Sequence, residues 1–270
     1  MTLTKAKQLL PRVKEDFIKI FPTAKTIVDD TPIVLLTNYN RKEKREKIIQ
    51  ECGASFKEDG DIKGEAIFGK KGKAVLVYPA VSQTDRDFYH TCWHELGHIF
   101  TRVIDKELFD IGEQDIKEDR DTKLRSGITL WSEFIAEYIA IIIENEPPLP
   151  IAWPKQDILT QLIKDSTLGD QLNPYPLAFY CAIMMGDNTI DEMLERVPDA
   201  DIGLDDCDEF LSKMIVELLR ILDKQLCKEN YWSVSKEKLE EIGAKVDEIW
   251  THCYYSVPLQ LLAKRIKKQT

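Results

Sequence analysis

The sequence predicts an α+β fold in which helices dominate, with a small twisted antiparallel or mixed sheet and a helical C-terminal portion. Three observations predict it. Apolar residues recur at helical spacing through most of the chain. Short runs rich in β-branched residues occur before residue 80, and they suffice only for a small sheet. Beyond Pro154 the pattern is mostly helical, and no internal repeat is visible.

Composition narrows the class of protein. The chain has 270 residues, of which 43% are hydrophobic and 31% charged, so it can form a sizeable core and is neither disordered nor fibrous. Its net charge of −10 disfavours nucleic acid as a partner, because a phosphate backbone is bound by clustered Lys and Arg. The six cysteines include no CxxC pair, which indicates reduced, intracellular thiols.

No targeting or membrane signal is evident. Charged residues interrupt the first 22 positions, so they lack the apolar core of a secretion signal. The longest wholly apolar run, Tyr138 to Ile143, is far shorter than the roughly 20 residues that cross a bilayer. We therefore expect a cytoplasmic protein that has neither a membrane nor nucleic acid as a partner.

The first 55 residues predict a scaffold. Helical spacing of apolar residues covers 3–20, a short apolar strand covers Ile33 to Leu36, and a charged helix begins at Arg41. The segment GEAIFGKKGKAVLVYP at 64–79 is typical of a β-hairpin, because a lysine turn bounded by glycines separates two runs of strand-forming residues.

A helix is expected over about 85–104. Ser82 or Thr84 can cap its N-terminus, and Asp85 and Asp87 fall in its first turn, where a negative charge interacts favourably with the helix dipole.

A second helix is expected over about 130–144, because the prolines at 147 and 148 cannot continue it. The mixed-charge segment Asp105 to Asp121 has no clear period and predicts a long surface loop. We expect residues 1–150 to form one domain and residues 151–270 a helical C-terminal subdomain. Its helices are predicted at about 155–166, 175–185, 205–228 and 235–266.

The helix over 85–104 contains His94-Glu95-Leu96-Gly97-His98, an HExxH motif. Two histidines one helical turn apart share a face and can bind a single Zn²⁺ at about 2.0–2.1 Å. The alternative is that these histidines merely pack or cap. Gly97 argues against it, since glycine inside a helix costs roughly 1 kcal/mol and indicates that another chain segment approaches closely there. Two of the four histidines of the chain lie in this motif, so chance explains it poorly.

Zinc needs a third protein ligand, and Glu133 is the best candidate. It lies with Glu137 in the apolar segment LWSEFIAEYIAIIIE, where burying a carboxylate is costly unless it is paired or metal-bound. We assign Glu133 to the metal and Glu137 to a hydrogen bond with a ligand histidine. Two alternatives stay open: the two glutamates exchange roles, or both face solvent on an amphipathic helix.

Other polar residues are weaker candidates. His90 lies about 12 Å from His98 along the helix axis, too far to share one ion, so we expect a structural or pocket-rim role. A donor to an oxyanion is chemically desirable. The sequence does not choose among the candidates, which are His252, Tyr138, Tyr175, Tyr180, Tyr254 and Tyr255.

HELGH followed by SEFIAEY resembles the zincin metallopeptidases, and more narrowly the gluzincin type, whose third ligand is a glutamate on a later helix. Over about residues 60–145 the chain is most similar to the bacterial and phage ImmA/IrrE-like peptidases. The resemblance implies a zincin-like fold with a small sheet, an HExxH helix and a glutamate-bearing helix. The spacing between His98 and Glu133 is long for that family, and no helix-turn-helix segment is evident.

These residues together predict a zinc-dependent metallopeptidase. His94, His98 and Glu133 would hold Zn²⁺, and Glu95 would act as general base toward a metal-activated water. As in related zincins, one strand of the hairpin, 64–69 or 73–78, would lie along the cleft as a sheet edge.

The expected substrate is an unfolded or flexible peptide, which can add to a sheet edge through main-chain hydrogen bonds. The alternative is a zincin-like regulatory or partner-binding protein without general proteolytic activity, in a phage, toxin–antitoxin or stress-response context. The presence of Glu95 favours the enzyme, because this residue holds no metal and serves only the chemistry.

Overall fold

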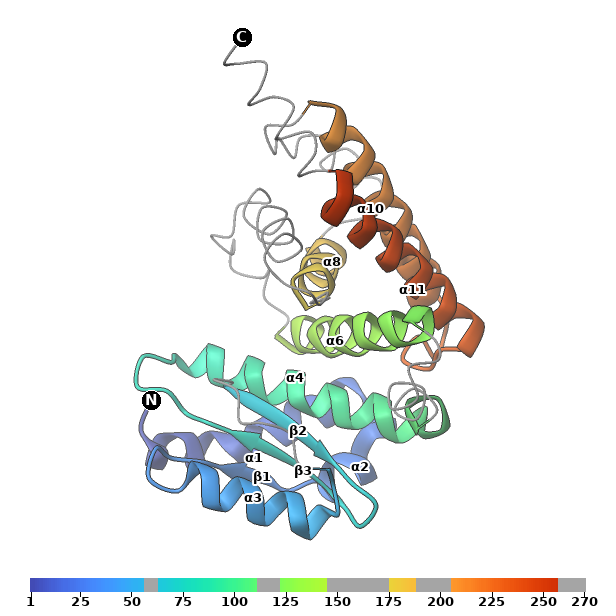
Figure 1. Ribbon diagram of the computed structural model, residues 1–270. Coiled ribbons are helices and arrows are strands. Elements are labelled where there is room, and N and C mark those ends of the chain that lie inside the picture. Colours follow the sequence, from blue (N-terminus) through green and yellow to red (C-terminus); the bar gives the residue numbers. More distant parts are fainter. Residues whose placement is uncertain (56–62, 111–121, 145–174, 188–204, 257–270) are drawn as a thin grey trace. The chain divides into compact units, whose positions relative to one another are not determined.

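A computed structural model describes residues 1–55, 63–110, 122–144, 175–187 and 205–256 (Figure 1). The chain divides into two compact units, one of Met1–Ile104 with Ile135–Asn145, the other of Asp105–Phe134 with Glu146–Thr270. One long helix, α6 (Thr122–Glu144), contributes to both. The predicted boundary between residues 150 and 151 lies outside the described residues, so the domain ranges stay a prediction.

The first unit contains a three-stranded mixed sheet. Strand β3 (Lys73–Val77) lies between β1 (Ile33–Leu35), to which it is parallel, and β2 (Gly64–Phe68), to which it is antiparallel. The backbone N–H of Gly69 donates to the carbonyl of Gly72 at 2.9 Å and closes the predicted hairpin. With helices dominating the described residues, the α+β class is confirmed.

Helices cover both faces of this sheet. Helix α3 (Arg41–Cys52) lies on one face, where Ile49 and Cys52 pack with Ala74 and Leu76 of β3. Since side chains alternate along a strand, Val75 and Val77 point to the opposite face. Helix α4 (Asp85–Ile104) packs there against β2 and β3 (Figure 1).

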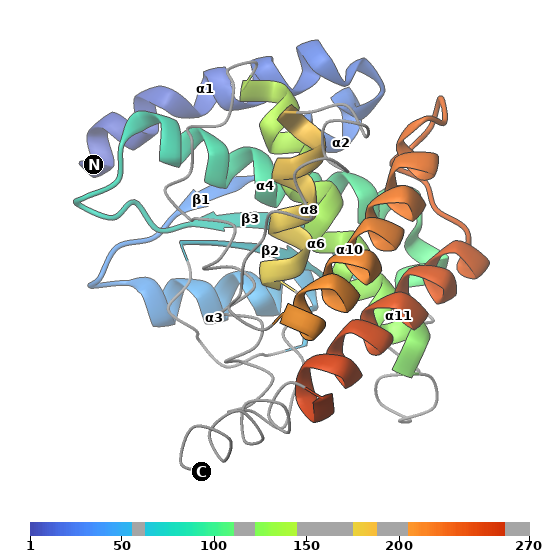
Figure 2. The ribbon, with the colours of Figure 1, turned by 90° about the horizontal axis from the view of Figure 1, so that it is seen from above.

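Helix α1 (Leu3–Ile20) flanks α4 on the same side of the sheet (Figure 2). The indole N–H of Trp93 donates to the carbonyl of Val13 at 3.1 Å, and the ring of Phe17 meets that of Phe100 edge to face. Two short helices follow α1, η1 (Pro22–Ala24) and α2 (Lys25–Asp29). Helix α4 is therefore a core helix, which fixes the positions of the motif that it carries.

Thr84 is the residue that caps α4, as one of the two sequence alternatives predicted. Its hydroxyl accepts from the backbone N–H of Asp87 at 3.1 Å, and the Asp87 carboxylate accepts from the backbone N–H of Thr84 at 2.9 Å. This reciprocal pair is a capping box. It satisfies two backbone donors and fixes the first turn of α4.

The C-terminal half of α6 packs directly on the HExxH segment. A Cβ added at Gly97 would lie 2.9 Å from Cα of Ala136 and 3.3 Å from its carbonyl oxygen. Real Cβ atoms do not approach a backbone carbon so closely, so only glycine permits this contact. The close approach that Gly97 predicts is confirmed, and the backbone of α6 is what approaches.

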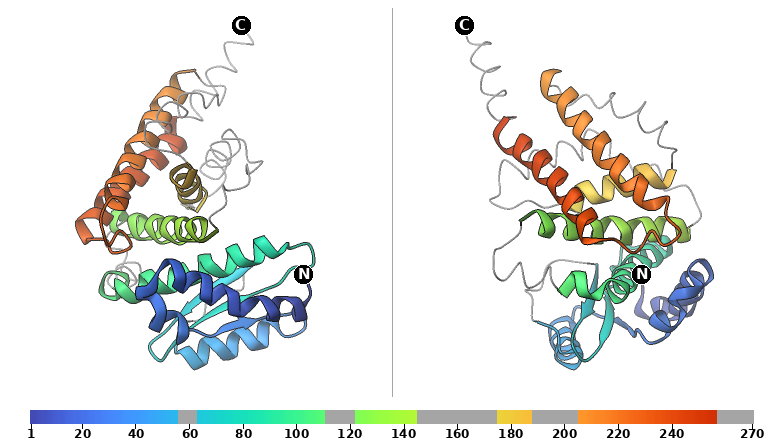
Figure 3. Two further views of the ribbon diagram at one scale, coloured as in Figure 1. Left: turned by 180° about the vertical axis from the view of Figure 1, so that it is seen from behind. Right: turned by 90° about the vertical axis from the view of Figure 1, so that its right-hand side faces the viewer.

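The second unit is helical. It contains α8 (Tyr175–Asp187), α10 (Asp205–Leu226), α11 (Lys236–Thr251) and a π-helical turn, η3 (His252–Ser256). Helices α10 and α11 lie side by side (Figure 3), and the ammonium of Lys245 joins them by an ion pair to Glu217 at 2.7 Å. The N-terminal half of α6 joins α11 through a 2.6 Å hydrogen bond from Ser126 to Asp247.

Helix α6 begins at Thr122, earlier than the predicted start near residue 130. The polar residues and glycine of its first two turns hide the apolar stripe of Leu124 and Ile128, which are buried. The prediction of a loop over 105–121 is wrong at 106–110, which are helical, with Phe109 buried. Helix α11 ends at Thr251, and the predicted helix at 155–166 lies outside the described residues.

By length and composition alone, α6 could span a membrane over Lys123–Glu144. However, 67% of its most apolar window is buried inside the protein. A buried core helix passes the same test, so this segment gives only weak support for a membrane role.

Replacing Gly97 by alanine tests the contact between α4 and α6. Alanine favours an exposed helix by about 1 kcal/mol over glycine, whereas overpacking against a backbone costs about 1–3 kcal/mol. We expect Gly97→Ala to lower the free energy of unfolding, measured by urea denaturation, because the atoms nearest to the added methyl group belong to the backbone of α6. Unchanged or increased stability of the variant would contradict this packing.

Candidate metal centre

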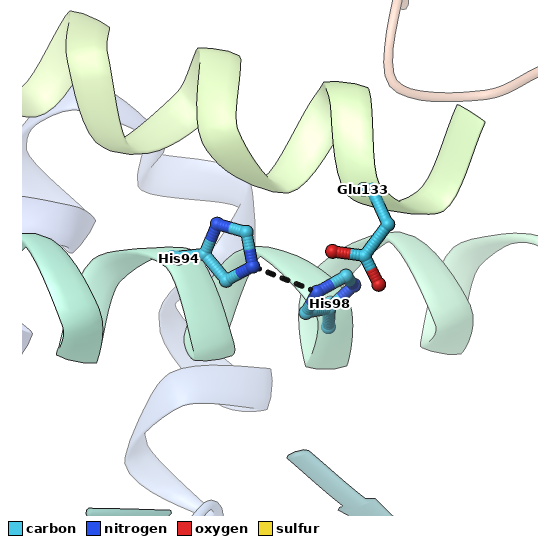
Figure 4. Close-up of side chains that lie close together, drawn as sticks. All are labelled: His94, His98 and Glu133. Carbon is cyan, nitrogen blue, oxygen red and sulfur yellow. Dashed lines mark hydrogen bonds between the residues drawn. The ribbon is translucent and has the colours of Figure 1, made fainter. Parts of the chain in front are cut away.

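The two motif histidines face each other across one turn of α4 (Figure 4). Nε2 of His94 lies 3.0 Å from Nε2 of His98, and the ring planes are inclined by 83°. Two nitrogens bound to one tetrahedral zinc at about 2.0–2.1 Å are about 3.3 Å apart. The observed separation is within a few tenths of an ångström of that value, so the rings need little movement to share an ion.

Glu133 completes a possible ligand set. One ligand atom from each of His94, His98 and Glu133 lies within 4.8 Å of the other two, and the Glu133 carboxylate reaches toward the rings in Figure 4. Glu133 stands on the same unbroken helix as the part of α6 that packs on α4, one turn before Glu137. Two imidazoles and a carboxylate are a donor set that zinc accepts in sites with an open fourth position. The residues therefore fit the metal.

Glu137 lies behind His94. Its Oε2 accepts from Nδ1 of His94 at 2.9 Å, and its side chain is only 3% exposed. A carboxylate only accepts hydrogen bonds, so Nδ1 carries the proton and Nε2 keeps its lone pair for a metal. Burial alone would raise the pKa of Glu137, but His90 and His94 outweigh it and lower that pKa to about 2.

This contact bears on the alternatives left open by the sequence. The hydrogen bond expected between Glu137 and a motif histidine is present. The alternative in which both glutamates face solvent is wrong, because Glu137 is buried. Because Glu137 is engaged with His94 and Glu133 lies in the ligand cluster, the geometry favours Glu133 as ligand over the exchanged roles.

His90 also contacts Glu137, and sequence reasoning missed this. Its Nε2 donates to Oε1 of Glu137 at 3.0 Å, while its Nδ1 lies 3.7 Å from Oε2 of Glu144. Burial lowers the pKa of His90, but Glu137 and Glu144 outweigh it and raise that pKa to about 9. The spacing of four residues between His90 and His94 was a signal that the two share a partner on a facing helix.

Glu95 is nearly buried, with 9% of its surface exposed, and it lies against the beginning of β2. A Cβ added at Gly64 would lie 2.7 Å from Oε1 of Glu95 and 2.8 Å from the methyl carbon of Thr91. Any larger residue at position 64 would displace the carboxylate. In the sequence Gly64 marks only the start of a strand, so this role had no local signal.

The candidate donors to an oxyanion stay open. The ring of His252 packs against Phe210, and that of Tyr254 stacks on Trp250, all within the second unit. Tyr138 follows Glu137 on α6, and the side chains of Tyr175 and Tyr180 lie outside the described residues. None of these positions selects one residue as the donor.

Comparison with known proteins finds no matching family model, no similar curated protein and no similar solved structure. Any functional assignment therefore rests on the residues of this chain and their geometry.

The two glutamates of α6 should differ in their effect on zinc affinity. Removing an outer hydrogen-bond partner of a ligand typically weakens metal binding about 10–100-fold. We expect Glu137→Ala to fall in that range and Glu133→Ala to exceed it, as measured by competition with a chelator. Glu43→Ala, which changes an exposed residue of α3, is the control. Equal and negligible effects at positions 133 and 137 would remove both residues from the site.

Proposed function

We propose that the protein is a zinc-dependent metallopeptidase that hydrolyses peptide bonds by metal-activated water, with Glu95 as general base. The observation that carries the proposal is the cluster of His94, His98 and Glu133 within 4.8 Å, with a further carboxylate, Glu95, adjacent in sequence and outside the ligand set. Three protein ligands together with a neighbouring carboxylate that is not a ligand are the composition of a hydrolytic zinc site.

When bound, zinc would polarise a carbonyl group and lower the pKa of a water molecule toward about 7. His94, His98 and Glu133 would hold it, and Glu137 would keep the His94 ring in the tautomer that offers Nε2. Each proposed ligand role thus falls on a residue of the cluster.

Glu95 would take the proton of the attacking water and pass it to the leaving amine. A general base must be an ionised carboxylate with little freedom to move away. The contact with Gly64 limits that freedom on one side, because the strand backbone lies directly against the carboxylate. Near-burial also keeps bulk water from the group.

The sheet supports a peptide as substrate. Of the two hairpin strands proposed to line the cleft, β3 is paired on both sides, whereas β2 pairs only with β3 among the described strands. An extended peptide could add to the outer edge of β2 through main-chain hydrogen bonds. Since Gly64 begins this strand and contacts Glu95, such a peptide would run past the base. Flexible or unfolded segments meet this requirement best.

The proposed family is the gluzincin type of zincins, most similar to the ImmA/IrrE-like peptidases. Three features support it: a small sheet precedes the HExxH helix, a later helix bears the third ligand, and the two helices are in contact. A cytoplasmic location fits the same proposal.

A zincin-like regulatory or partner-binding protein is the alternative function. Such a protein could keep the metal ligands without a base, so the two functions differ in what they require of Glu95. The carboxylate is present, nearly buried and confined, which favours the enzyme.

Glu95→Gln separates the two functions. It removes the base but no ligand, so the variant should bind zinc like the wild type and lose about 10²–10⁴-fold in hydrolysis of a mixed peptide pool. His94→Ala should instead lose the metal. Zinc content and product peptides are measured on the same samples, with Glu43→Gln as control. Full activity of Glu95→Gln on a peptide that the wild type cleaves would show that the base is wrongly assigned.

A further inference from the structure

A line of polar contacts extends from the ligand His94 toward the surface of the first unit. Glu137 accepts from Nδ1 of His94 at 2.9 Å with one oxygen and from Nε2 of His90 at 3.0 Å with the other. Glu144 lies 3.7 Å from Nδ1 of His90, and it binds Arg86 through two hydrogen bonds of 3.0 and 3.2 Å. Two antiparallel helices, α4 and the C-terminal half of α6, supply all five residues.

We propose that His90 is a positioning residue of the metal centre, which acts on His94 by fixing the carboxylate of Glu137. The inference rests on the proposed function, because it assumes that His94 is a zinc ligand. It adds a residue that binds no metal and contacts no reacting atom, yet sets how well the site holds zinc.

The orientation of the Glu137 carboxylate depends on its two hydrogen-bond donors, His90 and His94. A carboxylate held at one oxygen can still turn about its own axis, whereas donors on both oxygens fix its plane. Once this plane is fixed, Oε2 can hold the His94 ring in one orientation, with Nε2 directed at His98. Without His90, Oε1 of a carboxylate that is only 3% exposed would lose its partner. An unpaired buried oxygen would favour rearrangement of the carboxylate.

The spacing of residues along α4 explains why His90 and His94 contact the same carboxylate. His90 and His94 are four residues apart, so both project from one face of α4 toward α6 and bracket Glu137. The same spacing places Arg86 one turn before His90, where it binds Glu144. Glu144 lies 3.7 Å from Nδ1 of His90, beyond hydrogen-bond distance, so the bond from Nε2 of His90 to Glu137 is the contact that positions Glu137.

A purely structural role for His90 makes different predictions. If the residue only joined α4 to α6, its loss would lower stability and leave the zinc affinity of the folded protein unchanged. The Arg86–Glu144 pair provides a matched comparison, since it joins the same two helices through a different carboxylate.

The experiment compares His90→Leu, His90→Gln and Arg86→Met with the full-length wild type. Leucine removes the donor with little change in volume, whereas the glutamine amide can place an N–H near the position of Nε2. Zinc affinity is measured by chelator competition, and the visible absorption of the Co²⁺-substituted protein reports ligand geometry. We expect His90→Leu to weaken zinc binding about tenfold, the lower end of the range for outer partners, and to alter the Co²⁺ spectrum. His90→Gln should recover most of the affinity, and Arg86→Met should stay within about twofold of the wild type.

The possible results are distinguishable. A wild type that binds no zinc would contradict the proposed function itself. A wild type that binds zinc, with His90→Leu equal to it in affinity and spectrum, would overturn only the role of His90. Equal weakening by His90→Leu and Arg86→Met, without recovery in His90→Gln, would also overturn it, because the effect would then reflect helix packing in general. Thermal unfolding of the metal-free variants identifies any that fail to fold.

Discussion

The close contact between α4 and α6 at Gly97 and Ala136 is the constraint on which the candidate site depends. A residue with a Cβ at position 97 would hold the two backbones apart. With the backbones in contact, carboxylates from α6 reach imidazoles on α4: Glu137 meets His94, and Glu133 joins His94 and His98 in one ligand cluster. Helix α1 and the sheet hold α4 in the core, which fixes the position of Gly97 in this contact.

Burying a carboxylate in the core costs free energy, and hydrogen bonds from neighbouring side chains offset this cost. A buried carboxylate is acceptable when donors satisfy both of its oxygens, as His90 and His94 do for Glu137. Nε2 of His94 and Nε2 of His98 instead face each other at 3.0 Å, with Glu133 nearby. A divalent cation could bind one atom of each of the three residues at once. The same helices thus combine a paired structural carboxylate with a ligand set suited to zinc.

Local patterns in the sequence predicted much of this arrangement, whereas contacts between distant elements were harder to predict. Apolar periodicity located α1, and a capping residue with two first-turn aspartates located α4. The hairpin pattern located β2 and β3, and motif spacing identified His94 and His98. Two carboxylates on an apolar helix pointed to Glu133 and Glu137, of which Glu137 is buried and Glu133 half-buried. Three features escaped, namely the early start of α6, the Gly64–Glu95 contact and the bond from His90 to Glu137. The first two depend on which elements pack together, which no local pattern encodes. For the third, the spacing of His90 and His94 indicated a shared partner but did not identify it.

Zinc ligation by His94, His98 and Glu133 is best tested by X-ray absorption spectroscopy at the zinc edge of the zinc-loaded wild-type protein. We expect four nitrogen or oxygen donors at about 2.0–2.2 Å, two of which give the multiple-scattering signature of imidazole, and no sulfur. A sulfur shell near 2.3 Å, or scattering from fewer than two imidazoles, would contradict it, since zinc would then lie away from His94, His98 and Glu133.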